Sequence, residues 1–139
     1  MSRDHLLATT SDPQWISEDV LFAIHAQQIE RYGGLHGILD KNVVKSALVR
    51  AINRWAYDDN CDMADLAATY LVGFAGTQGF NDGNKRTGVA CALLFLAING
   101  IPWEGINPQQ LQQLAFDISN NLADVDRSAR FFRSQITRD

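Results

Sequence analysis

The sequence has 139 residues, of which 46% are hydrophobic and 20% charged. This is the composition of a globular protein, long enough for one domain with its own core and too short for two domains of ordinary size. The formal net charge of −4 argues against bulk nucleic-acid binding, because neutralising phosphates requires a basic surface. Cys61 and Cys91 are isolated and fit no metal-ligand spacing, which is typical of reduced thiols in a cytoplasmic protein.

The sequence offers no export signal and no membrane span. Its N-terminus lacks a charged segment followed by an apolar one, and the longest apolar run, residues 89–98, is too short to cross a bilayer. We therefore predict a cytoplasmic protein with no membrane partner. Residues 1–13 show no periodicity, so we expect a flexible leader to a single domain over residues 14–139.

Helical periodicity begins after the leader. Ser17 is a typical N-cap, and apolar residues follow it at helical spacing up to the breaker Gly33-Gly34. Residues 35–39 are expected to form a loop or a short flap. Asp40 is the predicted N-cap of a second helix, which carries apolar residues on one face: Val44, Ala47, Leu48, Ala51 and Ile52.

The middle of the sequence predicts two strongly apolar helices separated by a glycine-rich break. The first follows Asp62, and its apolar residues recur at positions i, i+3, i+4 and i+7. The break covers residues 76–83. The run that follows, residues 89–98, is apolar on every face, as expected for a helix at the centre of a bundle.

Two further helices complete the predicted chain. Asn107-Pro108 is an N-cap followed by proline at the first helical position. The last helix is expected to begin after Asp124 or Asp126. We expect an all-α fold of about six helices packed around the central apolar helix, with a short flap before the second. The fifth helix is predicted to present an apolar face: Leu111, Leu114, Ala115, Ile118 and Leu122.

The segment most informative about chemistry is residues 79–87, just before the central helix. A helix N-terminus carries partial positive charge, so Lys85 and Arg86 are unfavourable there unless an anion lies among them. Gly83 allows the backbone to approach such an anion closely, and the helix end supplies N–H donors. The segment therefore indicates a nucleotide or phosphate site.

Two neighbouring side chains extend this interpretation. Asn84 either caps the helix or binds the ligand, and Asp82 supplies a carboxylate able to hold Mg²⁺ against phosphate oxygens. On local features alone, a glycine loop with solvated charges is an equally good explanation. The segment is not a P-loop, because neither the spacing nor the preceding strand of that motif is present.

Residues 80–86 read Phe-Asn-Asp-Gly-Asn-Lys-Arg, which resembles the signature of the Fic/Doc superfamily. Lysine before the arginine is typical of its Doc (death-on-curing) branch. The resemblance covers roughly residues 14–136, including the opening helix, the flap and the hydrophobic run that ends at Ile98-Asn-Gly. It implies the Fic fold.

The sequence departs from the family at the position of the catalytic general base. Gln78 stands where the family has its catalytic histidine, and Gly79 replaces the adjoining proline. An amide does not titrate near neutral pH, and loss of general-base catalysis costs about a hundredfold to ten-thousandfold in rate. His36 in the flap and Asp82 are alternative general bases. However, His36 is better explained as a surface residue and Asp82 as a metal ligand. His25 is expected to be a packing or solvent-edge residue.

The resemblance implies a function. Doc-type proteins transfer a phosphoryl group from ATP, and Fic proteins a nucleotidyl group, to a protein hydroxyl. The Doc target is elongation factor Tu. Doc proteins are toxins that a separate antitoxin inhibits. The inhibitory Ser/Thr-x-x-x-Glu-Gly/Asn motif is absent here, because Gly100 stands four residues before Glu104-Gly105, so an inhibitor should come from another chain.

The resemblance also assigns roles to the motif residues. Asp82 is expected to bind Mg²⁺ and Phe80 to anchor the loop of the ATP site, while Gln78 at most orients the target hydroxyl. The backbone at Gly83 and three side chains are expected to bind the phosphates: Asn84, Lys85 and Arg86. The predicted catalytic set thus consists of Gln78, Asp82, Lys85 and Arg86.

Three functions remain open from the sequence. The first is a Doc-like toxin that carries out ATP-dependent transfer and is impaired by loss of the histidine. The second is a catalytically inactive Fic-fold module that binds a nucleotide, a phosphate or another protein. The third, a structural domain without a ligand, requires Lys85 and Arg86 to be incidental.

Overall fold

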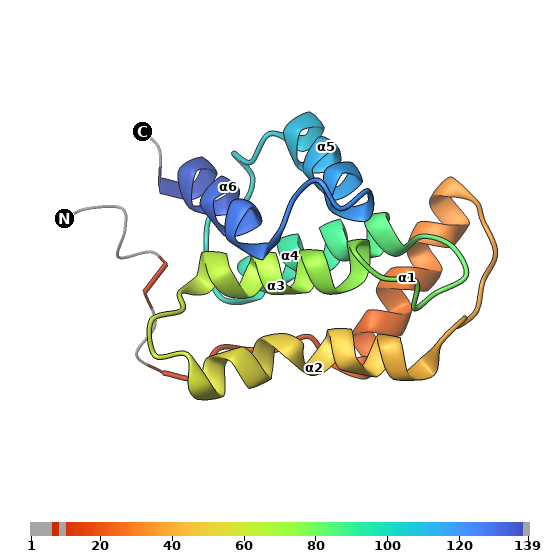
Figure 1. The fold of residues 1–139 in the computed structure, drawn as a ribbon, viewed down its shortest axis with the longest axis horizontal. Helices are drawn as coiled ribbons and strands as arrows, with labels where there is room; N and C mark the ends of the chain where they lie inside the picture. The colour runs from red at the N-terminus through yellow and green to blue at the C-terminus, as the bar shows by residue number, and fades with distance from the viewer. Residues whose placement is uncertain (1–6, 9–10, 138–139) are drawn as a thin grey trace.

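The computed structural model describes residues 7–8 and 11–137. Within these ranges the chain forms six helices and no strand, which confirms the predicted all-α class (Figure 1). A single isolated bridge joins Ile38 to Phe80. The helices are α1 (Glu18–Tyr32), α2 (Lys41–Tyr57), α3 (Met63–Ala75), α4 (Asn84–Ile98), α5 (Pro108–Ser119) and α6 (Val125–Thr137).

Local capping sets the helix boundaries. The Ser17 hydroxyl accepts a hydrogen bond from the N–H of Val20, and the Asp40 carboxylate accepts two from the first turn of α2. Asn107 caps α5 and Asp124 caps α6 in the same way. These starts confirm the predicted ones, because a cap depends on side chains within three residues of the helix end.

Two apolar helices share the centre of the bundle. α3 contacts α2, α4, α5 and α6, and α4 contacts α1, α3 and α5. Figure 1 shows α3 crossing the middle of the molecule, with α2 along one side and α5 and α6 on the other. Of the two, α3 is buried on more of its faces, while α4 leaves one side open near its N-terminus.

Two residues of the predicted apolar faces are exposed, and one of them, Leu122, lies outside the helix to which it was assigned. Leu122 lies beyond the end of α5 and is 66% exposed, because the chain leaves the helix at Ser119 and turns at Asn121, where φ is +60°. Ile52 lies at the edge of the apolar face of α2 and is 36% exposed. Helical periodicity identified the correct faces but overestimated their width and length.

Part of the predicted leader lies outside the described residues, namely residues 1–6 and 9–10. Leu7 is buried in the core, and its carbonyl oxygen accepts a 2.9 Å hydrogen bond from the N–H of Met63. Pro13 is also buried. The boundary between leader and domain stays a prediction.

The two cysteine side chains lie inside the protein. Both Cys61 and Cys91 are buried and free, and burial raises the pKa of Cys91 to about 12, which leaves this thiol protonated and unreactive. None of the helices in the described ranges is long and apolar enough to cross a membrane.

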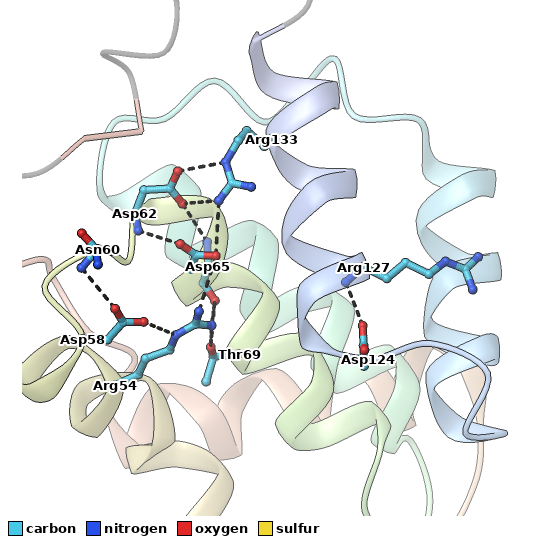
Figure 2. A network of polar contacts seen from close by, with 9 residues as sticks. All are labelled: Arg54, Asp58, Asn60, Asp62, Asp65, Thr69, Asp124, Arg127 and Arg133. Carbon is cyan, nitrogen blue, oxygen red and sulfur yellow. Dashed lines mark hydrogen bonds and ion pairs between the residues drawn. The ribbon is translucent and has the colours of Figure 1, made fainter.

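Charged side chains join three helices at the N-terminus of α3 (Figure 2). Asp62 and Asp65 form a reciprocal capping box, in which each carboxylate accepts from the other residue's N–H. Arg133 of α6 donates to both oxygens of Asp62, at 3.0 and 3.1 Å, and to Asp65 at 3.2 Å. Arg54 of α2 approaches Asp65 at 3.5 Å from the other side. The capping box therefore ties α2 and α6 to α3.

The Arg133–Asp62 pair should make stability depend on pH. Burial alone would raise the pKa of Asp62, but hydrogen bonds from Arg133 and from the N–H of Asp65 outweigh it, so this pKa lies below its usual value. A carboxyl group whose pKa is lowered on folding stabilises the protein above its unfolded pKa of about 3.9 and loses that contribution as pH falls through the folded value.

We predict that Arg133→Gln lowers the free energy of unfolding by about 1 kcal/mol at pH 7, because the pair is partly exposed and charge-assisted. The difference from the native protein should shrink as pH falls below about 4, because the unfolded state then binds a proton at Asp62, and it should be lost as pH falls through the lowered folded pKa. Denaturant unfolding at pH 7 and below pH 4 measures the difference in the free energy of unfolding. Arg130→Gln, an exposed arginine of the same helix outside this network, is the control and should leave stability nearly unchanged. Equal losses in the two variants would contradict the assignment.

Candidate functional site

The motif loop, residues 76–83, joins α3 to α4 and is fixed by the ring of Phe80. This ring is 1% exposed and stacks on His25 of α1, with 3.8 Å between ring centroids and 11° between planes. Phe74 lies on it at 6.3 Å, and Phe22 meets it edge-on at 6.4 Å. Phe80 therefore anchors the loop in the core, as its apolar character predicts.

Asn84, the first residue of α4, holds the backbone of the same phenylalanine. Its Oδ1 accepts from the N–H of Phe80 and its Nδ2 donates to the carbonyl of Phe80, both at 3.0 Å. The two hydrogen bonds close the motif loop onto the start of α4. Both ends of the side-chain amide are hydrogen-bonded, so in this structure the side chain of Asn84 shapes the loop. The backbone N–H of Asn84 is the group that it presents at the start of the helix.

The flap, residues 35–39, lies along the motif loop. The carbonyl of Gly79 accepts from the N–H groups of Leu39 and Asp40, at 2.9 and 3.0 Å. The N–H of Asn81 donates to the carbonyl of Gly37 at 3.1 Å. These bonds surround the isolated bridge between the two segments, and they place the exposed flap beside the motif.

Close packing explains the glycine at position 79. A Cβ atom there would lie 2.8 Å from Cγ2 of Val44 in α2, closer than real Cβ contacts allow. The loop therefore rests directly on the first turn of α2. A side chain or a proline ring at Gly79 would force these two segments apart.

Asp82 connects the motif to the flap and to α1. Its Oδ2 accepts from the N–H of Leu35 at 2.7 Å, and its backbone carbonyl lies 2.8 Å from Nε2 of His25. None of the hydrogen bonds formed within the described ranges uses Oδ1. The residue is half-buried, so this oxygen remains available to a ligand.

The N-terminus of α4 carries no side-chain cap. Gly83 occupies the N-cap position with φ of +81° and ψ of 15°, a left-handed conformation that glycine adopts without strain. The amides of the first turn have no intrahelical partner, and no side chain in the described part of the chain caps them. Uncapped amides at the positive end of a helix favour an anion.

The two predicted cations lie in different environments. Lys85 is exposed and takes part in no ion pair within the described ranges. Arg86 donates to the carbonyls of Gln28 and Gly33 at the C-terminal end of α1, at 3.3 and 3.0 Å, and stacks over Tyr32 at 5.4 Å. Carbonyl oxygens carry no formal charge, so Arg86 holds α1 against α4 and still supplies a positive charge.

A groove of about 530 Å³ begins at these cations and follows the open side of α4 between α1 and α5. Its floor is apolar. The aromatic residues on its two sides, Tyr32 and Phe116, are 61% and 52% exposed. Polar groups at one end and apolar surface along the rest are typical of a small-molecule site. The principal lining residues are Tyr32, Lys85, Arg86, Val89, Leu93 and Phe116.

The structure brings the predicted residues 80–86 together around the start of α4. Gln78 precedes them in the loop with an exposed side chain, and His36 lies in the exposed flap, where its carbonyl accepts from Nδ2 of Asn81. No three His, Cys, Asp or Glu side chains in the described part of the chain lie close enough to hold a metal ion together.

Sequence reasoning underestimated His25. This residue is 5% exposed and contacts the motif loop through both its ring face and Nε2. A signal was available, because His25 falls between Leu21 and Ile29 on the buried i, i+4, i+8 stripe of α1. The sequence could not show that this stripe meets the motif, which lies 57 residues further along.

Comparison with known proteins agrees with this architecture. Residues 15–96, which include α1 to α3, the motif loop and most of α4, match the model of the Fic/DOC family. The protein kinase doc of Escherichia phage P1 is 44% identical over 86 residues, covering 62% of this chain and 68% of the phage protein. The chain therefore belongs to the Fic/DOC family.

Proposed function

We propose that this protein is a Doc-like toxin that transfers a phosphoryl, or alternatively a nucleotidyl, group from ATP to a protein hydroxyl. The observation that carries the proposal is the uncapped N-terminus of α4, flanked by Lys85 and Arg86 and continuous with the groove. The name of the phage relative, protein kinase doc, supports the phosphoryl alternative. The absence of the motif histidine indicates that the activity is weak.

In this proposal the phosphates of ATP lie at the start of α4. The N–H groups of Gly83 and Asn84 donate to phosphate oxygens, and Lys85, which is exposed and forms no ion pair within the described ranges, adds a positive charge. Arg86 is held by carbonyls of α1 and contributes its charge from a fixed position. Phosphoryl transfer depends mainly on this kind of positioning and charge stabilisation.

The nucleoside fits the rest of the groove. Val89 and Leu93 supply an apolar floor, and Tyr32 and Phe116 supply exposed rings against which a base can stack. The volume of about 530 Å³ is within the range of small-molecule sites. Phosphates at one end and a base at the other would use the polar and the apolar parts of the groove together.

Asp82 is the proposed Mg²⁺ ligand. Its Oδ1, which accepts no hydrogen bond within the described ranges, fits the preference of this ion for carboxylate oxygens. One carboxylate together with nucleotide phosphates is a common arrangement for Mg²⁺. The ion would neutralise charge that develops on the phosphates. Meanwhile Oδ2 keeps its hydrogen bond to the N–H of Leu35 in the flap.

The transfer step requires a place for one proton. The target hydroxyl oxygen forms a bond to the γ-phosphorus, the bond to the bridging oxygen breaks, ADP leaves, and the hydroxyl proton must go to a base or to water. Gln78 can accept a hydrogen bond from the hydroxyl and orient it, but it cannot take up the proton. His36 and Asp82 are the nearest alternatives in the motif and flap, and neither is needed if transfer is slow.

Two proteins are proposed partners. Elongation factor Tu is the expected target through the resemblance to Doc proteins, and its hydroxyl-bearing segment would reach Gln78 beside the exposed flap. An antitoxin supplied by another chain would inhibit the protein by covering the same site. The exposed flap and groove leave room for a partner on this face.

The second candidate function is a nucleotide-binding module without catalysis. The exposed amide of Gln78 at the base position favours it, because every other feature of the phosphate site can persist when proton transfer is lost. The two functions differ in one result: detection of a covalently modified target would exclude the inactive module.

We predict that Lys85→Ala weakens binding of MgATP by roughly tenfold, because it removes a charge-assisted contact to phosphate. Isothermal titration calorimetry measures the affinity. The matched control is Lys45→Ala, an exposed lysine of α2 that does not line the groove, and it should bind as the native protein does. Equal affinities in the two variants would place the nucleotide elsewhere.

We predict that Gln78→His increases transfer from radiolabelled ATP to elongation factor Tu by about a hundredfold to ten-thousandfold. The rate should rise with pH through about 6.5, as the new imidazole loses its proton. Position 79 stays glycine in this variant, because a larger residue would strike Val44.

The control Gln78→Phe supplies a ring without a proton acceptor and should transfer no faster than the native protein. Slow transfer by the native protein supports the impaired toxin. Transfer by Gln78→His alone, with none by the native protein, supports the inactive module. No transfer by any form would argue against elongation factor Tu as the target.

A further inference from the structure

We infer that His25 is a positioning residue that sets the direction of the Asp82–Gly83 peptide, so that the N–H of Gly83 faces the phosphate at the start of α4. The inference deepens the proposed function and rests on it for the identity of the anion. Its structural part, the orientation of one peptide group, stands independently of any ligand.

The contact assigns a hydrogen to one nitrogen of the ring. Nε2 of His25 lies 2.8 Å from the carbonyl oxygen of Asp82. A carbonyl oxygen only accepts hydrogen bonds, so Nε2 carries the hydrogen and donates it. His25 is 5% exposed and its ring stacks on that of Phe80, which leaves the ring little freedom to turn away.

Peptide geometry converts this contact into a direction. No peptide in the described ranges is cis, so the carbonyl of Asp82 and the N–H of Gly83 point in opposite directions from one planar group. With the carbonyl held toward His25, the N–H of Gly83 must point away from the ring. It then joins the other uncapped amides at the start of α4.

The direction of this peptide needs such a constraint because Gly83 permits the opposite one. Its φ of +81° and ψ of 15° are close to those of the third residue of a type II turn. Reversing the preceding peptide gives the type I form, in which that residue has φ of about −90°, and glycine accepts either sign. The reversed peptide would direct the Asp82 carbonyl, instead of an N–H group, at a phosphate.

Two variants separate the hydrogen bond from packing. His25→Phe keeps a ring against Phe80 and removes the donor. His25→Gln carries an amide nitrogen at nearly the same distance from the backbone and restores the donor. Phe22→Leu is the packing control, because Phe22 also contacts Phe80 but makes no hydrogen bond to the motif loop.

The experiment measures two quantities on the full chain. The nuclear Overhauser effect between Hα of Asp82 and the amide hydrogen of Gly83 reports the direction of this peptide without ligand, because these hydrogens lie close together in the type II form and further apart in the type I form. Calorimetry reports the affinity for MgATP. We expect a strong effect in the native protein. His25→Phe should reduce it and weaken MgATP binding by about tenfold, while His25→Gln and Phe22→Leu stay near native values. Native values of both quantities in His25→Phe, or equal losses in His25→Phe and His25→Gln, would overturn the inference.

The readouts also separate this inference from the proposed function. If the native protein binds no MgATP, the proposed function fails, while the nuclear Overhauser effect still tests the role of His25. If His25→Phe does not fold, the native protein decides: a weak effect between Asp82 Hα and the Gly83 amide hydrogen would overturn the inference, and a strong one would support it.

Discussion

The structure of the motif depends on how Phe80 is held. Its ring is buried between His25 and Phe74, and its backbone N–H and carbonyl are both hydrogen-bonded to the side chain of Asn84. Burial fixes the depth of the loop, and the two hydrogen bonds fix its rotation relative to α4. Because these constraints use apolar and amide groups, they leave the charged groups of the motif available at the surface.

The rest of the site is assembled on this anchor. The flap is hydrogen-bonded to the loop on both sides of Phe80, and the side chain of Asp82 extends the attachment to Leu35. Arg86 draws the C-terminal end of α1 onto the first turn of α4. The result is a helix end without a side-chain cap among the described residues, beside an exposed lysine and an open groove. This arrangement suits the binding of phosphates whether or not Gln78 supports catalysis.

The sequence predicted the parts of the molecule that depend on neighbouring residues. Ser17, Asp40, Asp62 and Asn107 cap helices where expected, because capping is decided within one turn. The exposure of Leu122 was not predicted, since it follows from where the chain turns after α5. In the site, the residues of the motif were found, but the contacts that join it to α1 and the flap were not. His25 and Gln28 lie nearly sixty residues from their partners, and periodicity carries no information on such pairs.

The most direct test of the account is where a nucleotide binds. We would titrate the isotopically labelled protein with MgATP and follow every backbone amide by NMR. The account predicts the largest changes at the amides of residues 83–86, followed by Tyr32 and Phe116 in the groove. Saturable binding that leaves residues 83–86 unperturbed, or no binding at all, would contradict it.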